Sequence, residues 1–316
     1  MKIDFAILGK ENEVSGGHIY NRAIARDNDS VQLCYEQELT DFKACLQDSH
    51  DALLIDAWGL HNLEPGDVNQ KHYLLVHHPL ALDASLNGNE EKEIEFWNKA
   101  EGIVVTGQEV AEFVQSKTNT PVILIEPGFF KKSIRSENNN NDDFQILGIG
   151  SFIPRKGDEL LLASCENLKF PFVLNRLGPV VDHAYFKKLR SLVANGTHSN
   201  DINLVGEVDE KEKHDFMNSA SLAVFPTTYE SYGMAIQECL SHQIPVLTND
   251  VLGMKNRFGV KGIRYIDNSV AAWSLVLNEM ASRGKAYQGL KLEAKNNNLS
   301  FLSWETQSKK MSTFVK

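Results

Sequence analysis

The chain has 316 residues, which suggests about two domains at ordinary domain sizes. Its composition, 42% hydrophobic and 23% charged, is that of a globular protein, and its apolar runs are far shorter than the ~18–20 residues that span a bilayer. The net charge is −10, and residues 1–130 carry the acidic excess, which argues against broad binding of that part to nucleic acid or anionic lipid.

The start of the chain and its cysteines indicate where the protein works. The segment MKIDFAILGKENEV turns polar too soon for a signal peptide and is typical of a first β-strand. Cys34, Cys45, Cys165 and Cys239 are scattered, without C-x-x-C or metal-ligand spacing. We therefore expect reduced thiols, no metal site, no transmembrane segment, and a protein that is cytoplasmic or peripheral at a membrane.

Short apolar segments alternate with helical patterns along the first part of the chain. Strands are predicted at residues 2–8, 31–35, 51–57, 72–78, 102–107 and 122–126, and helices between them include residues 18–26 and 91–100. The Asn- and Asp-rich run at 136–144 is a natural linker.

After that run the alternation restarts. Strands are predicted at residues 144–150, 171–178, 203–208, 222–227, 244–249 and 263–267, and helices between them include 158–168, 184–194, 210–220 and 233–242. Strand–helix alternation predicts parallel sheets that are covered on both faces. We therefore expect an α/β protein with two doubly wound, Rossmann-like domains, residues 1–130 and 144–300, and ligands in the cleft between them. Residues 301–316 are helical in pattern.

The segment GIGSFIPRKG, residues 148–157, follows a strand and opens a helix. Glycines at the strand end, such as Gly150, allow close backbone approach to a ligand, and Ser151 is the next residue. Arg155 and Lys156 lie just before a helix start, where an anion is favoured. This pair could hold a diphosphate, with the guanidinium as a bidentate clamp. The alternative is a solvated basic turn.

The segment PTTYESYGMAIQECL contains two glutamates eight positions apart. Glu230 is expected in a loop after a strand, and Glu238 in the helix that follows, where its carboxylate could accept hydrogen bonds from ribose hydroxyls. Backbone amides at the helix start form another anion site. These amides belong to Ser231, Tyr232, Gly233 and Met234. For Glu238 the alternative is an exposed helical carboxylate.

Two segments of the first domain could also contact a ligand. His77 and His78 end a strand before Pro79, and an imidazole there could donate to a substrate oxygen or act as an acid or base. Gly16 and Gly17 open the first helix, where the backbone could approach a phosphate or sugar. The alternatives are a packed histidine and a plain glycine turn.

Together these segments resemble the retaining family-4 glycosyltransferases with the GT-B fold. ESYGMAIQECLSHQIPV is similar to the E-x7-E motif of that family, and GSFIPRKGDELLLAS to its P-x-K-G stretch. SGGH resembles the first-loop glycine motif, IEPGF the end of the N-terminal domain, and LSWE the start of the crossover helix. We expect this helix, residues 301–316, to pack back on that domain, with packing on the second domain as the alternative. The resemblance covers nearly the whole chain.

The resemblance implies a retaining, metal-independent glycosyltransferase of the hexosyltransferase type, without a cofactor. Arg155 and Lys156 would hold the diphosphate of a UDP- or GDP-sugar, Glu230 would touch the sugar hydroxyls, and Glu238 would bind the ribose. His77, or as second choice His78, would contact the transferred sugar. The amides from Ser231 to Met234 would line the sugar and phosphate, and Gly16 and Gly17 would approach the donor phosphates.

The chain departs from the family pattern at Ser151, where many members have Arg, and at Gln243 and Ser231, where glycine is common. The sequence does not identify the acceptor, which we expect to be a glycan or glycolipid. We favour a role in polysaccharide assembly. Two other functions remain open: a nucleotide-sugar 2-epimerase and a non-catalytic partner subunit of a glycosyltransferase.

Overall fold

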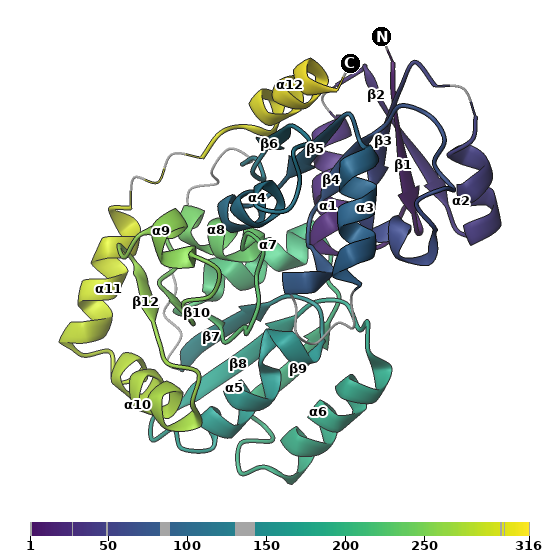
Figure 1. Ribbon diagram of the computed structural model, residues 1–316. Helices are drawn as coiled ribbons and strands as arrows, with labels where there is room; N and C mark the ends of the chain where they lie inside the picture. Colours follow the sequence, from purple (N-terminus) through teal and green to yellow (C-terminus); the bar gives the residue numbers. More distant parts are fainter. Residues whose placement is uncertain are drawn as a thin grey trace. The chain divides into compact units, whose positions relative to one another are not determined.

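The computed structural model, drawn as a ribbon in Figure 1, describes residues 2–26, 28–48, 50–82, 89–129, 143–297, 299 and 301–315. The chain folds as two compact units. Unit 1 consists of residues 1–131 and 301–316, and unit 2 consists of residues 132–300. Of the predicted linker, residues 136–142 lie outside the described residues.

Unit 1 is built on a six-stranded parallel sheet with the strand order β2-β1-β3-β4-β5-β6. Its strands are β1 (Ile3–Leu8), β2 (Val31–Glu36), β3 (Ala52–Asp56), β4 (Tyr73–Val76), β5 (Gly102–Val105) and β6 (Val122–Leu124). Ile3 of β1 lies opposite Val31 of β2 and Ala52 of β3. All residues of β3 and β5 are buried, because both faces of these central strands are covered.

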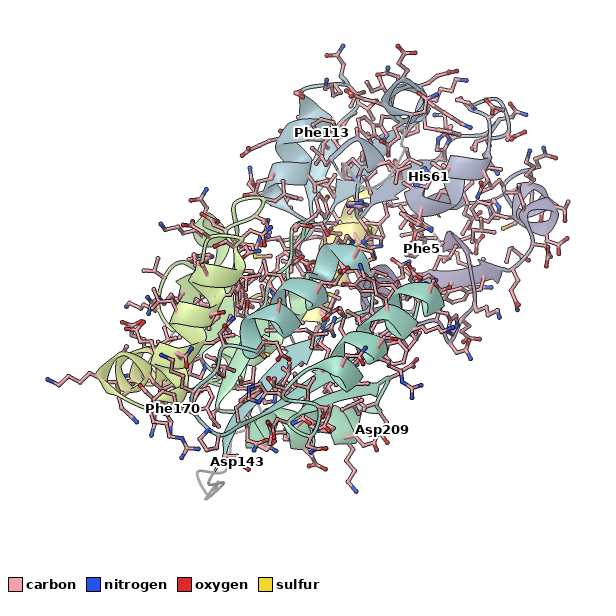
Figure 2. All side chains as sticks on the ribbon, turned by 90° about the horizontal axis from the view of Figure 1, so that it is seen from below. Phe5, His61, Phe113, Asp143, Phe170 and Asp209 are labelled. Atoms are coloured by element: carbon pink, nitrogen blue, oxygen red, sulfur yellow. The ribbon has the colours of Figure 1, made fainter. Side chains whose placement is uncertain are left out.

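The helices of unit 1 connect these strands. They are α1 (Gly16–Arg26), α2 (Leu39–Cys45), α3 (Glu90–Lys99), α4 (Gln108–Gln115) and α12 (Trp304–Phe314), with the 3₁₀ turns η1 (Ala57–Asn62) and η2 (Leu80–Leu82). Phe113 of α4, labelled in Figure 2, packs edge-on against Trp97 of α3, with 6.1 Å between the ring centroids. This contact forms part of the core between the sheet and its helices.

Helix α12 comes from the far end of the chain and packs against α1. Ser303 caps its first turn by accepting a hydrogen bond from the amide of Thr306. The Trp304 ring is buried with its centroid 5.4 Å from that of Tyr20, and Ser308 Oγ donates to the Ile24 carbonyl. Residues 301–315 therefore contribute to the core of unit 1.

Unit 2 also contains a six-stranded parallel sheet, with the strand order β12-β11-β10-β7-β8-β9. Its strands are β7 (Phe144–Ile149), β8 (Phe172–Leu177), β9 (Ile202–Gly206), β10 (Leu222–Phe225), β11 (Val246–Thr248) and β12 (Ile263–Tyr265). Its helices are α5 (Asp158–Cys165), α6 (His183–Asn195), α7 (Glu210–Ser219), α8 (Met234–Ser241), α9 (Met254–Phe258), α10 (Val270–Ala281) and α11 (Lys285–Lys295), with the 3₁₀ turn η3 (Pro154–Lys156). Two doubly wound parallel sheets with flanking helices confirm the predicted α/β class.

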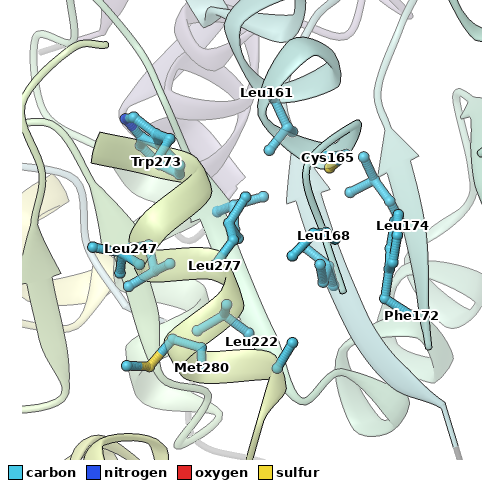
Figure 3. Close-up of a cluster of buried hydrophobic side chains, with 14 of the residues drawn as sticks. Leu161, Cys165, Leu168, Phe172, Leu174, Leu222, Leu247, Trp273, Leu277 and Met280 are labelled. Carbon is cyan, nitrogen blue, oxygen red and sulfur yellow. The ribbon is translucent and has the colours of Figure 1, made fainter. Parts of the chain in front are cut away.

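The core of unit 2 lies between its sheet and the helices α5 and α10. Leu161 and Cys165 of α5 and Leu277 of α10 lie in one cluster with Leu174 of β8 and Leu222 of β10 (Figure 3). These side chains are nearly inaccessible to solvent, so their burial is a main source of stability for the unit.

Each sheet reverses its winding at one point. In unit 1 the reversal lies between β1 and β3, and in unit 2 it lies between β7 and β10. The loops that leave the carboxyl ends of such a strand pair diverge, so ligands of doubly wound proteins bind there. The segments 150–157 and 226–233 follow β7 and β10, Gly16 lies in the segment after β1, and Asp56 is the last residue of β3.

Within the described ranges, none of the helices has both the length and the apolar character that a membrane-spanning helix requires.

Candidate functional site

The loops after β7 and β10 are joined to each other by backbone contacts. The Thr228 amide donates to the Arg155 carbonyl over 2.9 Å, and Thr227 Oγ1 donates to the same oxygen over 3.1 Å. Gly157, between η3 and α5, has a φ of +75°, and a Cβ there would collide with the Pro226 carbonyl oxygen. Glycine is therefore required at this position for both its conformation and the close approach of the two loops.

The central contact of these loops is an ion pair between residues 74 positions apart. Lys156 Nζ lies 2.5 Å from Glu230 Oε2, and the two side chains are only 19% and 18% exposed. Pro154 begins the 3₁₀ turn that directs Lys156 toward the second loop. The sequence placed both residues at this edge of the sheet, but it did not indicate that they pair.

Two arginines hold the Tyr-Glu-Ser-Tyr loop from either side. Arg155 donates from Nη1 to the Tyr229 carbonyl over 3.2 Å, and its guanidinium lies 5.8 Å from the centre of the Tyr229 ring. Arg257 of α9 donates from Nη1 to the Tyr232 carbonyl over 2.8 Å and lies 5.0 Å from the Tyr232 ring centre. Arg257 was not predicted from the sequence. The only feature of the sequence that could have indicated Arg257 is its position as a basic residue shortly after β11, the strand that neighbours β10.

The three cations set the charge state of Glu230. Burial alone would raise its pKa, but the charges of Lys156, Arg155 and Arg257 lower the pKa below the usual carboxyl value. Burial lowers the pKa of Lys156, and Arg155 and Arg176 act in the same direction, against the attraction of Glu230. Glu230 is therefore an ionised hydrogen-bond acceptor at neutral pH, with a positive surrounding that suits an anion.

Glu238 lies in the second turn of α8 and has its own cationic partner. Gly233, with a φ of +97°, precedes the helix, and Ser231 and Met234 flank this turn. Glu238 Oε2 lies 3.3 Å from Lys213 Nζ on α7. Burial raises the pKa of Glu238, and the charge of Lys213 opposes that rise. Lys213 was not predicted, because nothing in the spacing of α7 relates it to α8.

A buried ion pair supports the backbone of the first loop. Arg176 Nε lies 2.5 Å from Asp158 Oδ1, and the side chains are 5% and 3% exposed. The same guanidinium donates to the carbonyl oxygens of Gly150 and Ser151 over 2.5 and 3.2 Å. A Cβ on Gly150 would lie 3.5 Å from Lys156 Cε, so the lysine stem runs alongside this glycine.

The second group of predicted residues lies in unit 1 at its own winding reversal. Gly16 and Gly17 are the first residues of α1, and a Cβ on Gly17 would lie 3.2 Å from His77 Cδ2. Gly17 thus makes room for the imidazole. The Tyr20 ring packs edge-on against His77 with 5.1 Å between centroids. His78 is the next residue and is half-buried.

His77 is joined to two polar residues that the sequence analysis missed. His77 Nε2 lies 2.8 Å from Asn21 Oδ1, Asn21 Nδ2 donates to Asp56 Oδ2 over 2.7 Å, and His77 Nε2 lies 3.8 Å from that carboxylate oxygen. Asn21 and Asp56 are buried. The available signal was a carboxylate that ends the apolar run ALLID, next to the point where the sheet reverses.

The structure thus gathers the predicted residues into two groups. Arg155, Lys156 and Glu230 meet in unit 2, and Gly17 meets His77 in unit 1. No group of three or more His, Cys, Asp or Glu side chains that could hold a metal ion occurs among the described residues.

Three comparisons with known proteins relate these features to a family. A model described as "Glycosyl transferases group 1" matches residues 129–296, more than half of the chain. An uncharacterized glycosyltransferase of Methanocaldococcus jannaschii is 26% identical over 191 residues, which are 58% of this chain and 52% of that protein. The chain therefore spans about half the length of this curated relative.

Solved structures share the fold over nearly the whole chain. A sucrose-phosphate synthase from Thermosynechococcus elongatus has a TM-score of 0.79 at 16% identity, with 99% of this chain and 97% of that chain covered. HepE of Anabaena, in complex with UDP and glucose, has a TM-score of 0.77 at 15% identity, with 99% and 98% covered. These likenesses concern the fold alone, whereas the family model rests on sequence: the chain belongs to the glycosyl transferases group 1 family.

Proposed function

We propose that the protein is a glycosyltransferase that moves a hexose from a nucleoside diphosphate sugar, UDP- or GDP-linked, to a glycan or glycolipid acceptor with retention of configuration. We further propose that it needs no metal ion and works in the cytoplasm or at a membrane surface. Family membership supports sugar transfer, and the charges around Glu230 support an anionic donor.

The observation that carries the proposal is the pairing of Lys156 with Glu230 at the winding reversal of unit 2. The Lys156 ammonium lies next to the Glu230 carboxylate, and Arg155 is the residue before Lys156. A diphosphate needs positive charge and a sugar needs hydrogen-bond acceptors, so the two parts of a donor match these groups. The ion pair also keeps Lys156 oriented before a donor arrives.

The directions of the pKa shifts support the roles that we propose for these groups. Lys156 and Arg155 would hold the diphosphate and stabilise the charge that develops on the leaving nucleotide. The lowered pKa of Glu230 makes it a poor proton donor, so Glu230 would accept hydrogen bonds from the sugar hydroxyls. Its ion pair makes it a weak nucleophile. Leaving-group stabilisation with attack from the same face is thus preferred over a covalent intermediate.

The remaining predicted residues fit the other parts of such a donor. Glu238 would accept hydrogen bonds from the ribose hydroxyls, and the charge of Lys213 opposes the rise of its pKa on burial. The amides from Ser231 to Met234, at the start of α8, would face the sugar and phosphate. His77, with Gly16 and Gly17 beside it, would contact the transferred sugar. The UDP and glucose bound by HepE support this class of donor.

A panel of nucleotide sugars tests the proposal by thermal shift. A donor present at 100 times its Kd should add ~2.7 kcal/mol to the free energy of unfolding. Slow hydrolysis of the stabilising donor, and the anomeric configuration of the released sugar by NMR, then test turnover and retention. We expect Lys156→Ala to abolish both stabilisation and turnover.

The matched control is Lys188→Ala, which removes a lysine from an ion pair with Glu159 on the exposed surface of unit 2. Unchanged turnover in Lys156→Ala would refute the role of the ammonium. An epimerised nucleotide sugar formed without acceptor would favour the isomerase. Binding without hydrolysis or transfer would favour the partner subunit.

A further inference from the structure

The hydrogen bonds around His77 fix which ring nitrogen carries its proton. Asp56 is a carboxylate and can only accept, so the Asn21 group that lies 2.7 Å from Asp56 Oδ2 must be the amide nitrogen. The Asn21 carbonyl oxygen then faces His77 Nε2 over 2.8 Å. Two acceptors cannot share a hydrogen bond, so Nε2 must carry the proton.

The second ring nitrogen is thereby left as an acceptor. A neutral imidazole with a proton on Nε2 has a lone pair on Nδ1. Among the described residues, no hydrogen bond to His77 Nδ1 occurs, and the His77 side chain keeps 17% of its surface exposed. Nδ1 can therefore accept a hydrogen bond from a molecule outside the protein.

Burial keeps this imidazole neutral. Burial lowers the pKa of His77, and the nearby His18 lowers it further, against the charge of Asp56. The ring is also fixed in place. Tyr20 contacts it edge-on, Tyr20 OH donates to the Ile125 carbonyl over 2.8 Å, and Trp304 packs on the other side of Tyr20. Tautomer and orientation are thus both set before a ligand binds.

We propose that Asn21 and Asp56 are positioning residues that hold His77 as the Nε2-protonated imidazole, so that Nδ1 accepts a hydrogen bond from a saccharide hydroxyl. This inference rests on the proposed function for the identity of the ligand, but the tautomer itself does not. A sugar hydroxyl is a good donor for such a site because it can donate to Nδ1 while it accepts elsewhere.

Asp56→Asn provides a sharp test because it should reverse donors and acceptors along the hydrogen bonds from Asp56 through Asn21 to His77, which we call the relay. Asp56 Oδ1 accepts a hydrogen bond from the Trp58 amide over 3.0 Å. In the variant, the single side-chain oxygen stays with that amide and the new NH₂ faces Asn21. Asn21 then turns its carbonyl toward residue 56 and its NH₂ toward His77, so the ring proton must move to Nδ1.

The measurement is a long-range ¹H–¹⁵N spectrum of the ¹⁵N-histidine-labelled protein at pH 7, with the His77 signals assigned by their loss in His77→Gln. We expect Nε2 to be protonated in the natural sequence and Nδ1 in Asp56→Asn. Asn21→Ala is a second variant, for use if Asp56→Asn folds poorly. It deletes the amide between Asp56 and His77, so we expect the two ¹⁵N signals of His77 to average between the two tautomers. The matched control is Asp4→Asn, which removes a carboxylate 2.9 Å from His50 in the same unit.

Turnover of the donor found in the thermal-shift panel supplies the second readout. We expect kcat/KM to fall about 5- to 150-fold in Asp56→Asn, the range for a buried polar group left without its hydrogen-bond partner, and to stay unchanged in Asp4→Asn. A proton on Nδ1 in the natural sequence, or an unchanged tautomer in Asp56→Asn, would overturn the relay. An inverted tautomer with unchanged turnover would overturn its role. The expected tautomers without turnover of any nucleotide sugar would refute the proposed function and leave the relay standing.

Discussion

Replacing Lys156 by Met tests whether the pair with Glu230 holds the two loops of unit 2 together. Met keeps most of the length of the side chain and removes only the ammonium. The carboxylate that remains is 18% exposed, so water replaces the lost partner poorly. The variant therefore measures the free energy of leaving Glu230 in place without its closest cation.

The expected size follows from the burial and from the other charges. Removing one partner of a buried pair costs roughly 3–5 kcal/mol. Arg155 and Arg257 also lower the pKa of Glu230, and they remain in the variant. We therefore expect the low end, about 3 kcal/mol, which is a fall in Tm of roughly 6–12 °C for a unit of this size.

The pH dependence has a definite sign. The pKa of Glu230 is lowered in the folded state, so the stability that this shift contributes is present above the ordinary carboxyl pKa. It is lost as the pH falls through the folded-state pKa. Lys156→Met raises that pKa, so the difference in stability between the two proteins should be largest near pH 7 and should shrink at acid pH.

The assay is urea unfolding between pH 4 and pH 8, completed by Glu230→Gln and the double variant. The double variant should lose less free energy of unfolding than the sum of the two single variants, because a neutral pair leaves no buried charge. Lys188→Met, in the exposed pair with Glu159, should cost under about 1 kcal/mol. The reasoning fails if Lys156→Met costs no more than Lys188→Met, or if the two single losses simply add.

Two further predictions concern the supports of the site. Gly157→Ala should lower the free energy of unfolding by more than the ~1–2 kcal/mol of a left-handed residue, because its Cβ would also collide with the Pro226 carbonyl oxygen. The control is Gly206→Ala, at a φ of +94° with open space around it, which should cost only the backbone strain. Equal losses of stability in urea unfolding would contradict the collision. Lys213→Met should raise the pKa of Glu238 further and so make nucleotide affinity fall more steeply as the pH is lowered. Calorimetric titration from pH 5 to 8 checks this against Lys309→Met, whose lysine pairs with Glu305 on the exposed face of α12. Superimposable pH profiles would refute it.

Much of the fold follows from local patterns. Buried strands of parallel sheets are short apolar runs, and every predicted strand has a counterpart within a few residues. Strand ends were predicted too long where a loop begins, as at 72–78, because β4 ends at Val76 and the loop begins with His77 and His78. The strand order is less visible, since alternation alone does not say where the winding reverses.

The site was predicted only where a motif is local. GIGSFIPRKG and YESYGMAIQE each lie in one segment, so their residues could be found by type and spacing. Asn21 and Asp56 come from different segments and meet only because the sheet places α1 beside the end of β3. Arg257 and Lys213 act through partners on other elements in the same way. Contacts between residues that lie far apart in the chain cannot be predicted from a single sequence.

The packing of α12 has a consequence for the order in which the chain can fold during synthesis. The Trp304 ring that backs Tyr20, and through it His77, emerges from the ribosome after all of unit 2. About 170 residues separate the two parts of unit 1, which corresponds to a delay of about 10–35 s at ordinary elongation rates. Unit 2 is therefore the first to have its complete sequence available. During that interval the face of α1 that α12 covers stays exposed to solvent.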